Sequence, residues 1–248
     1  MRLRVGLANS LRFEQSTDTT EVKQTVKASL TYSEEPSNMY EPNTRDLKAP
    51  SLTYDALILA GGKGTRIDGR DKGWIMYNGL PLIEHTLARL AAQAPQPARI
   101  MISANRNIDA YKQTGHIVVT DERFNFAGPL AGLEAGLMRC KKNNLFVVPC
   151  DTPFLPVSLF DRLQLALSEG DHTLAAYATT DDGPQPLCCL IHPSLAGSLA
   201  KYLDGGNASA IKWLEQVGAQ AVYFSDTNAF SNFNTLDMFQ TPTGKGQP

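Results

Sequence analysis

A glycine-rich segment with an arginine and a lysine behind it carries the clearest chemistry in this sequence. It runs from Leu59 to Lys72 as LAGGKGTRIDGRDK, directly after a short apolar run. Glycine has no side chain, so the backbone N–H groups of such a turn can approach phosphate oxygens closely. Arg66 can form forked hydrogen bonds to phosphates, and Lys72 can supply a mobile positive charge. The segment therefore predicts a triphosphate site, with Gly61 and Gly62 at its start.

Three other interpretations of this segment are weaker. A Walker A loop requires Gly-Lys-Ser/Thr after four spacer residues, and the segment does not have that order. A dinucleotide-binding fingerprint could start at Gly62 and Gly64, but Ile67 occupies the position of its third glycine. A plain surface turn would explain the glycines, but not their combination with Arg66 and Lys72 after a buried strand. Phosphate binding is therefore favoured.

Asp151 is the best candidate for holding a metal ion. It follows the apolar run 145–148, so it lies just past the carboxyl end of a predicted strand. Ligands of open α/β sheets bind beyond these strand ends. Mg²⁺ is typically bound by one or two carboxylates together with phosphate oxygens and waters. The alternative is that Asp151 caps a helix that begins after Pro156, but the spacing is long for a cap.

Two further polar segments follow predicted strands and are expected at the same edge of the sheet. Asp121, which precedes the segment GPLAG at 128–132, could accept hydrogen bonds from a base or a ribose. It could equally be a turn aspartate. Ser103 and Asn105 end another strand, and the amide of Asn105 has both a donor and an acceptor for reading a nucleobase edge.

Apolar runs alternate with helical periods from Asp55 onward. A continuous apolar run such as 56–60 is typical of a buried parallel strand, and Pro81 is well placed at a helix start. The expected strands cover 56–60, 99–103, 116–119, 145–148, 172–178, 187–191 and 221–224. The expected helices cover 81–94, 129–140 and 158–167, with two short helices separated by 204–207. This alternation predicts an α/β fold with a mostly parallel central sheet flanked by helices.

The composition divides the chain into three parts. Residues 1–53 contain few large apolar side chains and no sustained period, so we expect a disordered N-terminal extension rather than a binding segment. Residues 54–242 are expected to form one folded domain, and residues 243–248 a flexible tail.

Composition and charge narrow the class of protein. The net charge of −2 lacks the basic surplus of a nucleic-acid-binding protein, so a small-molecule partner is expected. No apolar run reaches membrane-spanning length, and no signal-peptide core follows the N-terminus. The four cysteines lack zinc-ligand spacing, and Cys188 and Cys189 would point to opposite faces of a strand, so reduced thiols are expected. We therefore expect a cytoplasmic protein that binds neither nucleic acid nor a membrane.

Taken together, these segments resemble the molybdenum cofactor guanylyltransferase family over residues 55–240, nearly the whole chain outside the N-terminal extension. The glycine-rich loop alone is similar to that of sugar-phosphate and cofactor nucleotidyltransferases in general. The features that narrow the resemblance are Asn105-Arg106, Asp121 with the glycines at 128–132, Cys150-Asp151-Thr152-Pro153, and the closing Phe230-Ser231-Asn232-Phe233-Asn234-Thr235.

The resemblance implies a Rossmann-like nucleotidyltransferase fold and a set of site residues. Arg66, Lys72 and Asp151 would be catalytic, and Asp151 would also bind Mg²⁺ as the cofactor. Asn232 and Asn234 would contact the pterin. The residues that would contact GTP are Leu59, Ala60, Gly61, Gly62, Lys72, Ser103, Asn105, Asp121 and Asp151.

The sequence departs from the family pattern at two places. Ser103 stands where asparagine is common, so either Ser103 or Asn105 could make the base contact. Ile67-Asp68 replaces the usual Met-Gly after the arginine and adds a carboxylate near the phosphates. Asp68 would weaken triphosphate affinity unless it points away.

The reaction implied by the resemblance is an in-line displacement at the α-phosphorus of GTP by the terminal phosphate of molybdopterin, with loss of pyrophosphate. Such chemistry asks mainly for positioning and charge neutralisation. Lys72 and Arg66 would offset charge on the leaving group, and Mg²⁺ at Asp151 would bridge the reacting phosphate. The attacking phosphate is already anionic, so no general base is needed. GTP and molybdopterin would be the partners, with transient contacts to cofactor-synthesis or acceptor enzymes.

Three alternatives stay open at this point. A CTP-using sister enzyme, or a nucleotidyltransferase for another phosphate-bearing acceptor, would use the same glycine-rich loop. A non-catalytic carrier of molybdenum cofactor would have no use for Lys72 and Asp151, which argues against it. A NAD-binding dehydrogenase is disfavoured by Ile67.

Overall fold

The computed structural model describes residues 53–61, 71–121, 123, 128–170 and 172–233. All of the described residues lie in one compact unit of the chain. The expectations for residues 1–52 and 243–248 lie outside the described residues, as do Gly62, Arg66 and Asn234. No helix in the described part of the chain is long and apolar enough to span a bilayer.

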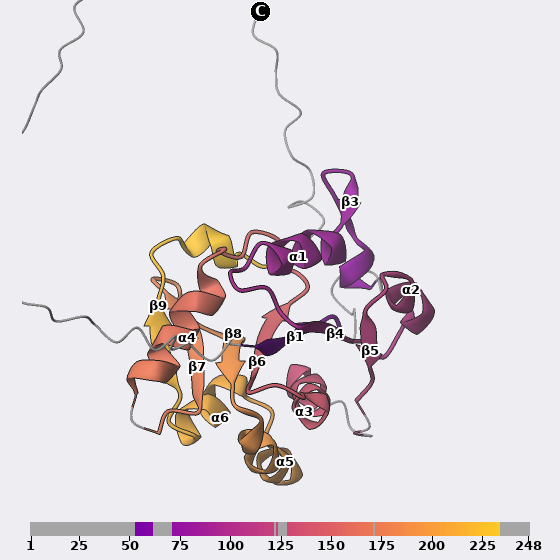
Figure 1. The fold of residues 1–248 in the computed structure, drawn as a ribbon. Helices are drawn as coiled ribbons and strands as arrows, with labels where there is room; N and C mark the ends of the chain where they lie inside the picture. Colours follow the sequence, from indigo (N-terminus) through magenta and orange to yellow (C-terminus); the bar gives the residue numbers. More distant parts are fainter. Residues whose placement is uncertain (1–52, 62–70, 122, 124–127, 171, 234–248) are drawn as a thin grey trace, which may run out of the picture. The chain divides into compact units, whose positions relative to one another are not determined.

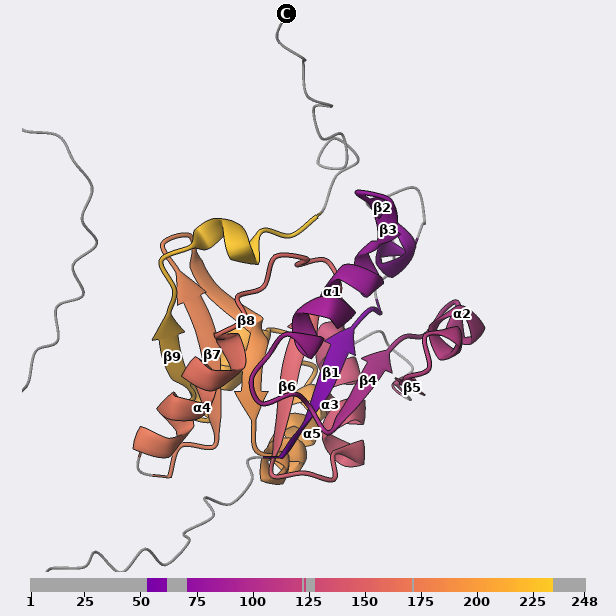
Figure 2. The ribbon, with the colours of Figure 1, turned by 45° about the horizontal axis from the view of Figure 1, so that its top comes forward.

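A seven-stranded sheet forms the centre of the described domain (Figure 1). Its strands, in spatial order, are β5 (Ile117–Val119), β4 (Arg99–Ser103), β1 (Tyr54–Leu59), β6 (Asn144–Pro149), β8 (Gly183–Ile191), β7 (Ala175–Thr180) and β9 (Gln220–Tyr223). The first four run parallel to one another, as do β7 and β9, whereas β8 is antiparallel to both of its neighbours (Figure 2). The predicted α/β fold with a mostly parallel sheet is therefore confirmed.

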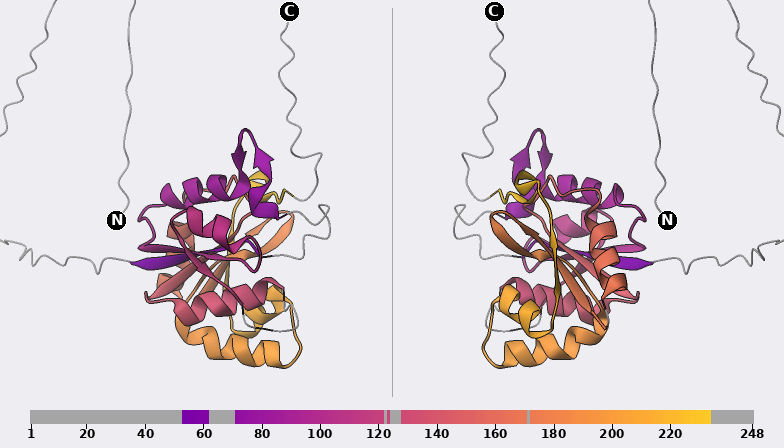
Figure 3. Two further views of the ribbon diagram at one scale, coloured as in Figure 1. Left: turned by 90° about the vertical axis from the view of Figure 1, so that its right-hand side faces the viewer. Right: turned by 90° about the vertical axis from the view of Figure 1, so that its left-hand side faces the viewer.

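Helices cover both faces of this sheet (Figure 3). One face carries α1 (Leu82–Ala91), α2 (Ile108–Gln113) and α4 (Leu159–Glu169), and the other carries α3 (Pro129–Arg139), α5 (Ala196–Asp204) and α6 (Ala210–Gln216). Alternate side chains of β1 pack on opposite layers, Ala56 and Ile58 on the first and Leu57 and Leu59 on the second. A strand buried on both faces needs apolar residues at successive positions, which explains the continuous run 56–60.

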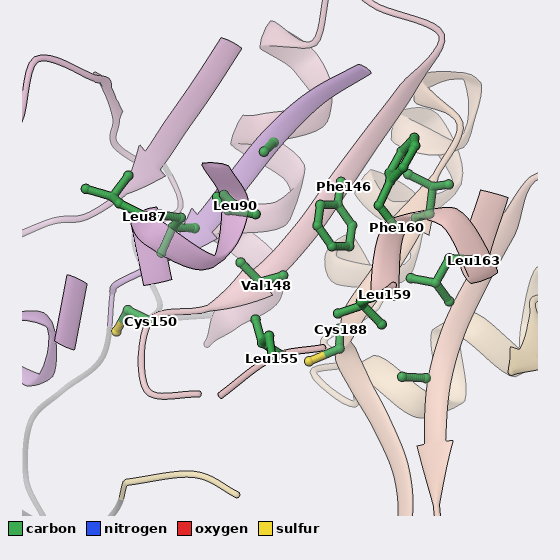
Figure 4. Packing of buried hydrophobic residues seen from close by; sticks show 14 of the residues in the cluster. Leu87, Leu90, Phe146, Val148, Cys150, Leu155, Leu159, Phe160, Leu163 and Cys188 are labelled. Atoms are coloured by element: carbon green, nitrogen blue, oxygen red, sulfur yellow. The ribbon is translucent and has the colours of Figure 1, made fainter. Parts of the chain in front are cut away.

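Aromatic and branched side chains of β1, β6 and α4 form the core of the first layer (Figure 4). The ring of Tyr54 stacks on Phe160 with centroids 3.6 Å apart, and Phe146 meets Phe160 edge-on at 5.7 Å. Burial of one such side chain stabilises a fold by about 1.5–3 kcal/mol. This packing gives β1 and β6 a fixed position beneath the residues that follow their carboxyl ends.

The structure contains a hairpin that the hydrophobic period does not predict. β2 (Met76–Tyr77) and β3 (Leu80–Pro81) pair around Asn78 and Gly79, whose φ angles are 46° and 82°. Asn-Gly is the strongest short-range hairpin signal, because these residues tolerate positive φ at both central positions of the turn. Strands of two residues are too short to show an alternating pattern, so the dipeptide is the signal that could have found them.

β8 begins at Gly183 rather than at the predicted Leu187, even though Pro184 and Pro186 lie within it. Proline lacks a backbone donor and is normally confined to edge strands. Only residues 189–191 pair with β6, so the first half of β8 pairs with β7 alone and behaves as an edge. Pro184 and Pro186 therefore lie in the half of β8 that lacks a second partner strand, and β8 begins four residues before the predicted start.

The cysteines are free thiols, as expected. Cys188 packs in the first layer and Cys189 in the second, so the geometry of β8 separates their sulfur atoms. Burial raises the pKa of Cys150 and Cys188 well above the ordinary value for a thiol. Neither is therefore a thiolate nucleophile at neutral pH.

Gly136 of α3 lies where the packing excludes a side chain. A Cβ built there would lie 2.5 Å from Cδ2 of Leu57 and 3.3 Å from Cδ2 of Leu145, both fully buried in the sheet. Gly136→Ala is therefore expected to destabilise the fold by about 1–3 kcal/mol, although alanine is the better helix former. Urea unfolding measures the change.

Gly197→Ala in α5 is the matched control for this prediction, because no atom in the described part of the chain lies within 4 Å of a Cβ built at Gly197. Alanine there is expected to be neutral or to stabilise by no more than about 1 kcal/mol. Equal free energies of unfolding for the two variants would show that α3 can shift away from the sheet at little cost.

Candidate active site

The carboxyl ends of four parallel strands meet at one edge of the sheet. Leu59, the last residue of β1, is paired with Ser103 of β4 and with Pro149 of β6, and Ser103 is paired with Val119 of β5. The segments that follow these ends carry Gly61, Asn105, Asp121 and Asp151. Polar residues from four distant parts of the sequence are thus brought to one edge, as expected for an open α/β sheet.

A cavity of about 190 Å³ opens at this edge. Its lining residues are Leu59, Ala60, Gly61, Lys72, Arg106, Pro129, Pro149, Cys150, Asp151 and Leu187. Among the described residues of this lining, the charged side chains are those of Lys72, Arg106 and Asp151, so two cations and one carboxylate interrupt a largely apolar wall. An apolar cavity with a few convergent charged groups is the usual form of a small-molecule site.

Lys72 and Asp151, which are 79 positions apart, form an ion pair in the cavity lining. Nζ of Lys72 donates to Oδ2 of Asp151 at 2.8 Å, and the two side chains are 28% and 14% exposed. Both charged groups are therefore compensated by each other and still accessible from solvent. The helix-capping alternative for Asp151 is wrong, because α4 begins directly after Ser158 and the carboxylate of Asp151 is bound to Lys72.

Contacts from three parts of the chain hold the backbone around Asp151. The N–H of Cys150 donates to the carbonyl of Leu59 at 3.1 Å and extends the contact between β1 and β6. The hydroxyl of Thr86 in α1 donates to the carbonyl of Cys150 at 3.2 Å. The N–H of Phe233 donates to the carbonyl of Asp151 at 2.9 Å. The position of the carboxylate is thus set by packed elements rather than by a free loop.

A short helical turn, η1 (Lys72–Trp74), begins at the site lysine and is capped by Asp71. Oδ1 of Asp71 accepts a hydrogen bond from the N–H of Gly73 at 3.2 Å. The same carboxylate accepts from Nδ2 of Asn107 at 3.0 Å and from the hydroxyl of Tyr111 at 2.7 Å. Asp71 therefore connects the turn of the site lysine to the segment at the start of α2.

Asn105 and Asp121 are bonded to each other beyond the ends of β4 and β5. Nδ2 of Asn105 donates to Oδ2 of Asp121, and the N–H of Asp121 donates to Oδ1 of Asn105 at 3.2 Å. Asn105 is exposed, whereas Ser103 is 3% exposed, and a Cβ built on Gly132 of α3 would come within 2.3 Å of the Ser103 hydroxyl. Of the two candidates for a base contact, Asn105 is the one whose side chain is open to solvent.

Arg123 anchors the chain just after Asp121. Its guanidinium forms a forked pair with Glu134 of α3, with N–O distances of 2.6 and 2.7 Å. It forms a further ion pair with Asp204 at the end of α5, at 2.9 Å. These partners tie the segment that carries Asp121 to two helices of the second layer.

Arg106 lines the cavity, although its sequence context indicates only membership of a family motif and no role in the site. A cation directly after Asn105, at the end of a strand, is the signal that could have found it. Asn232 is exposed and precedes Phe233, whose N–H binds the carbonyl of Asp151. The roles predicted for Gly62, Arg66 and Asn234 fall on residues outside the described ranges.

The carboxylate of Asp151 fits a divalent cation that is shared with a ligand. Within the described ranges, no group of three or more His, Cys, Asp or Glu residues could hold an ion. A single accessible carboxylate suits Mg²⁺, which usually takes one or two protein carboxylates and completes its coordination with phosphate oxygens and waters. The donor set therefore suits a metal that is bound together with a phosphorylated ligand.

The chain is similar in sequence to known proteins over most of the described domain. The model of the MobA-like NTP transferase domain matches residues 56–220. The molybdenum cofactor guanylyltransferase of Cupriavidus metallidurans is 45% identical over 185 residues, which cover 73% of this chain and 90% of that protein. The protein of the same name from Pasteurella multocida is 41% identical over 192 residues, which cover 77% of this chain and 100% of that protein.

Solved structures of nucleotidyltransferases share the fold. Molybdopterin-guanine dinucleotide biosynthesis protein A from Archaeoglobus fulgidus has a TM-score of 0.58 at 23% identity and covers 74% of this chain and 93% of its own. The 2-C-methyl-D-erythritol 4-phosphate cytidylyltransferase from Thermus thermophilus has a TM-score of 0.54 at 12% identity, over 74% and 94% of the two chains. These likenesses confirm the Rossmann-like nucleotidyltransferase fold. Because the family model matches most of the described domain and the curated relatives exceed 40% identity, the chain belongs to the family of MobA-like NTP transferases, together with the molybdenum cofactor guanylyltransferases.

Proposed function

We propose that this protein transfers GMP from GTP to the terminal phosphate of molybdopterin, releases pyrophosphate and so forms the guanine dinucleotide cofactor. The observation that carries the proposal is the pairing of Lys72 with Asp151 in a cavity beyond the ends of β1 and β6. The relatives named molybdenum cofactor guanylyltransferase support the choice of guanine and of the acceptor.

The backbone at Gly61 supports phosphate binding. A Cβ built there would lie 3.7 Å from the carbonyl oxygen of Ser103, which is an ordinary contact, so protein packing does not require glycine. Gly61 is exposed in the cavity lining, where the lack of a side chain lets a phosphate reach the backbone. We assign Gly62 and Arg66, which continue this segment in the sequence, to the same triphosphate.

Lys72 would bind the β- and γ-phosphates when the nucleotide enters. Its ammonium has three donors, so it can take phosphate oxygens as partners while it stays close to Asp151. A fixed cation at this place stabilises pyrophosphate as negative charge grows on the leaving group. A phosphate can reach this lysine because its side chain is 28% exposed.

Asp151 would hold Mg²⁺ together with phosphate oxygens of the nucleotide. When bound, the ion neutralises charge on the reacting phosphate. An anionic oxygen of the molybdopterin phosphate forms the new bond to the α-phosphorus, and the bond from that phosphorus to the β-phosphate oxygen breaks. The electron pair leaves with pyrophosphate. No proton has to be removed from the nucleophile, so the work of this chain is to bind, orient and neutralise.

The nucleoside of GTP and the pterin of molybdopterin would lie on either side of the reacting phosphates. A cavity of 190 Å³ is smaller than the roughly 300–1,000 Å³ of a typical ligand pocket, so the nucleoside would extend along the rim. We assign Asp121 and either Asn105 or Ser103 to the ribose and base. We assign Asn232 and Asn234 to the pterin, because the Phe233 N–H binds Asp151 and brings that segment to the phosphate centre.

Transfer assays with radiolabelled nucleotides test the proposal. The protein is incubated with Mg²⁺, molybdopterin and each α-labelled nucleoside triphosphate in turn. Label from GTP is expected in the dinucleotide product, and chelation of the metal is expected to stop transfer. Transfer from CTP instead would identify a cytidylyltransferase, and binding of molybdenum cofactor without any label transfer would identify a carrier.

Substitutions should separate the nucleotide half of the site from the pterin half. Lys72→Ala removes a cation from the triphosphate, so it is expected to weaken GTP binding and to slow transfer together. Asn232→Ala and Asn234→Ala remove neutral hydrogen bonds worth on the order of 1 kcal/mol each. They are expected to weaken molybdopterin binding and leave the affinity for GTP nearly unchanged. Calorimetric titration of each ligand into each variant measures both affinities.

Asn228→Ala is the control for these asparagine variants, because Asn228 is also exposed and lies on the neighbouring turn η3 (Thr227–Phe230). It is expected to bind both ligands like the unchanged protein. Normal molybdopterin binding by the Asn232 and Asn234 variants, with a loss of stability or of GTP affinity, would show that these residues only hold the turn together.

A further inference from the structure

A hydrogen-bond network fixes the turn from which Lys72 projects. The carboxylate of Asp71 is its centre and accepts from Tyr111, Asn107 and Gly73 at 2.7, 3.0 and 3.2 Å. Tyr111 belongs to α2 and Asn107 directly precedes it, whereas Gly73 belongs to the turn itself. A carboxylate with three donors from two segments cannot rotate without breaking several of these bonds. The turn is therefore held at a defined place relative to α2.

Tyr111 fills the space beside this turn. Its side chain is 0% exposed, and a Cβ on Gly73 would lie 2.3 Å from its hydroxyl oxygen. Its ring packs against Trp74, with centroids 5.2 Å apart. Burial raises the pKa of Tyr111 far above the ordinary value, so the hydroxyl stays a donor to Asp71 throughout the neutral range. Tyr111 thus fills the space beside Gly73 and also donates a hydrogen bond to Asp71.

Asn107 directs its side chain away from its own helix. It directly precedes α2 and has a φ of 49°, a left-handed conformation that asparagine adopts more readily than most other residues with a side chain. Asparagine at this position usually caps the helix that follows, yet its side chain makes no such bond here. Its amide binds Asp71 instead. The described bond of this side chain therefore goes to a carboxylate on another segment and not to α2.

We propose that Tyr111 and Asn107 are positioning residues, which act through Asp71 to hold Lys72 over the phosphates of the nucleotide. The inference rests on the proposed function, because it assigns the nucleotide phosphates to Lys72. A lysine side chain is long and flexible, so its ammonium reaches a defined point only if its backbone is fixed. Arg106, which lines the same cavity, immediately precedes Asn107. One segment therefore sets the place of both cations.

Tyr111→Phe tests this role, with Tyr54→Phe as the matched control. Tyr54 is also buried, at 1% exposure, and its hydroxyl donates to the carbonyl of Pro95 at 2.8 Å. Both variants lose one hydrogen bond from a buried hydroxyl. Because Tyr54 lies at the opposite end of β1 from the site, only Tyr111→Phe loses its bond near Lys72. Tyr111→Phe is expected to raise the Kd for Mg²⁺–GTP on the order of tenfold. Tyr54→Phe is expected to keep the Kd for Mg²⁺–GTP within about twofold of the unchanged protein. The melting temperature is expected to fall by a similar amount in both variants. Equal Kd values for the two variants would overturn the proposal.

A double-mutant cycle tests whether Tyr111 acts through Lys72. In a Lys72→Ala background, Tyr111→Phe is expected to cause no further loss of affinity for GTP, because the group that it positions is gone. A further tenfold loss in that background would overturn the proposal. Asn107→Gly tolerates the same backbone conformation without the amide, so it is expected to weaken GTP binding in the same direction and to show the same dependence on Lys72. Unchanged affinity for GTP in Asn107→Gly would show that Asn107 is not a positioning residue.

A readout that needs no nucleotide separates this proposal from the proposed function. Lysines are labelled by reductive ¹³C-methylation, and the Lys72 signal is assigned by its loss in Lys72→Arg. Tyr111→Phe is expected to shift and broaden this signal, and Tyr54→Phe is expected to leave it in place. An unmoved signal in Tyr111→Phe would overturn the positioning role. If the unchanged protein bound neither GTP nor CTP, the proposed function would fail, and the lysine signal would still decide whether Tyr111 fixes Lys72.

Discussion

Asp151→Asn is expected to lower the rate of nucleotidyl transfer at ordinary Mg²⁺ concentrations by on the order of 10²–10³-fold while the protein stays folded. The amide keeps the size of the side chain but loses the negative charge that would hold the cation beside the phosphates. Its oxygen can still accept a hydrogen bond from Lys72, whose Nζ lies 2.8 Å from the carboxylate. The backbone bonds of Cys150 and Phe233 at this loop do not involve the side chain. The loss should therefore fall on turnover rather than on folding.

Steady-state rates over a range of Mg²⁺ concentrations measure this effect, and the variant is expected to need more metal. Asp109→Asn is the control, because Asp109 is also paired with a lysine, Lys112 at 3.2 Å, but is 91% exposed and lies on α2. The control should turn over at the normal rate. If Asp151→Asn did the same at ordinary Mg²⁺, Asp151 would have no part in binding the metal.

Arg99→Met is expected to destabilise the fold by about 3–5 kcal/mol, measured by urea unfolding at neutral pH. Its partner Asp55 in β1 has a side chain with 0% exposure. Nε of Arg99 donates to Oδ1 of Asp55 at 3.0 Å, and the N–H of Lys141 donates to Oδ2 at 2.8 Å. Methionine preserves most of the aliphatic stem but leaves a buried carboxylate without its counter-ion. Lys112→Met breaks an exposed pair, with side chains 62% and 91% exposed, and is expected to cost no more than about 0.5 kcal/mol.

Lowering the pH should narrow the difference between Arg99→Met and the unchanged protein. Burial by itself raises the pKa of Asp55, but the hydrogen bonds from Arg99 and from the Lys141 N–H, with the charge of Arg99, outweigh it and hold the pKa below its ordinary value. Ionised Asp55 therefore stabilises the fold above its unfolded-state pKa, and this contribution is lost as the pH falls through the lower folded-state pKa. In Arg99→Met, burial is no longer opposed by the guanidinium, so the carboxyl takes up its proton at a higher pH. Unfolding at pH 7 and near pH 4 compares the two proteins. If the difference in unfolding free energy between the two proteins were the same at both pH values, Arg99 would not be what keeps the pKa of Asp55 low.

Strands that are buried on both faces could be predicted from the sequence, because they have apolar residues at successive positions. The apolar runs at 56–60, 99–103 and 145–148 coincide closely with β1, β4 and β6. The first half of β8 could not be found in this way, since its prolines are tolerated only because β7 is its single partner there. α2 has six residues, which is too few for a helical period to show.

Part of the candidate site could likewise be predicted from the sequence. Gly61 and Asp151 could be assigned to one edge from sequence, because each follows a buried strand and parallel strands have their carboxyl ends at the same side of a sheet. Residue types were also enough to name Lys72 as a phosphate cation and Asp151 as a metal ligand. These remain predictions about role, while their common location is now observed.

Contacts between distant segments could not be predicted from local patterns. Lys72 meets Asp151 across 79 positions, and Asp71 accepts hydrogen bonds from Asn107 and Tyr111, which lie beyond α1 and β4. Side-chain periodicity reports whether a residue faces the interior of its own element, and it contains nothing about which residue of another element lies opposite. That pairing depends on strand register and on the path of the chain between elements, so it follows only from the packed three-dimensional structure.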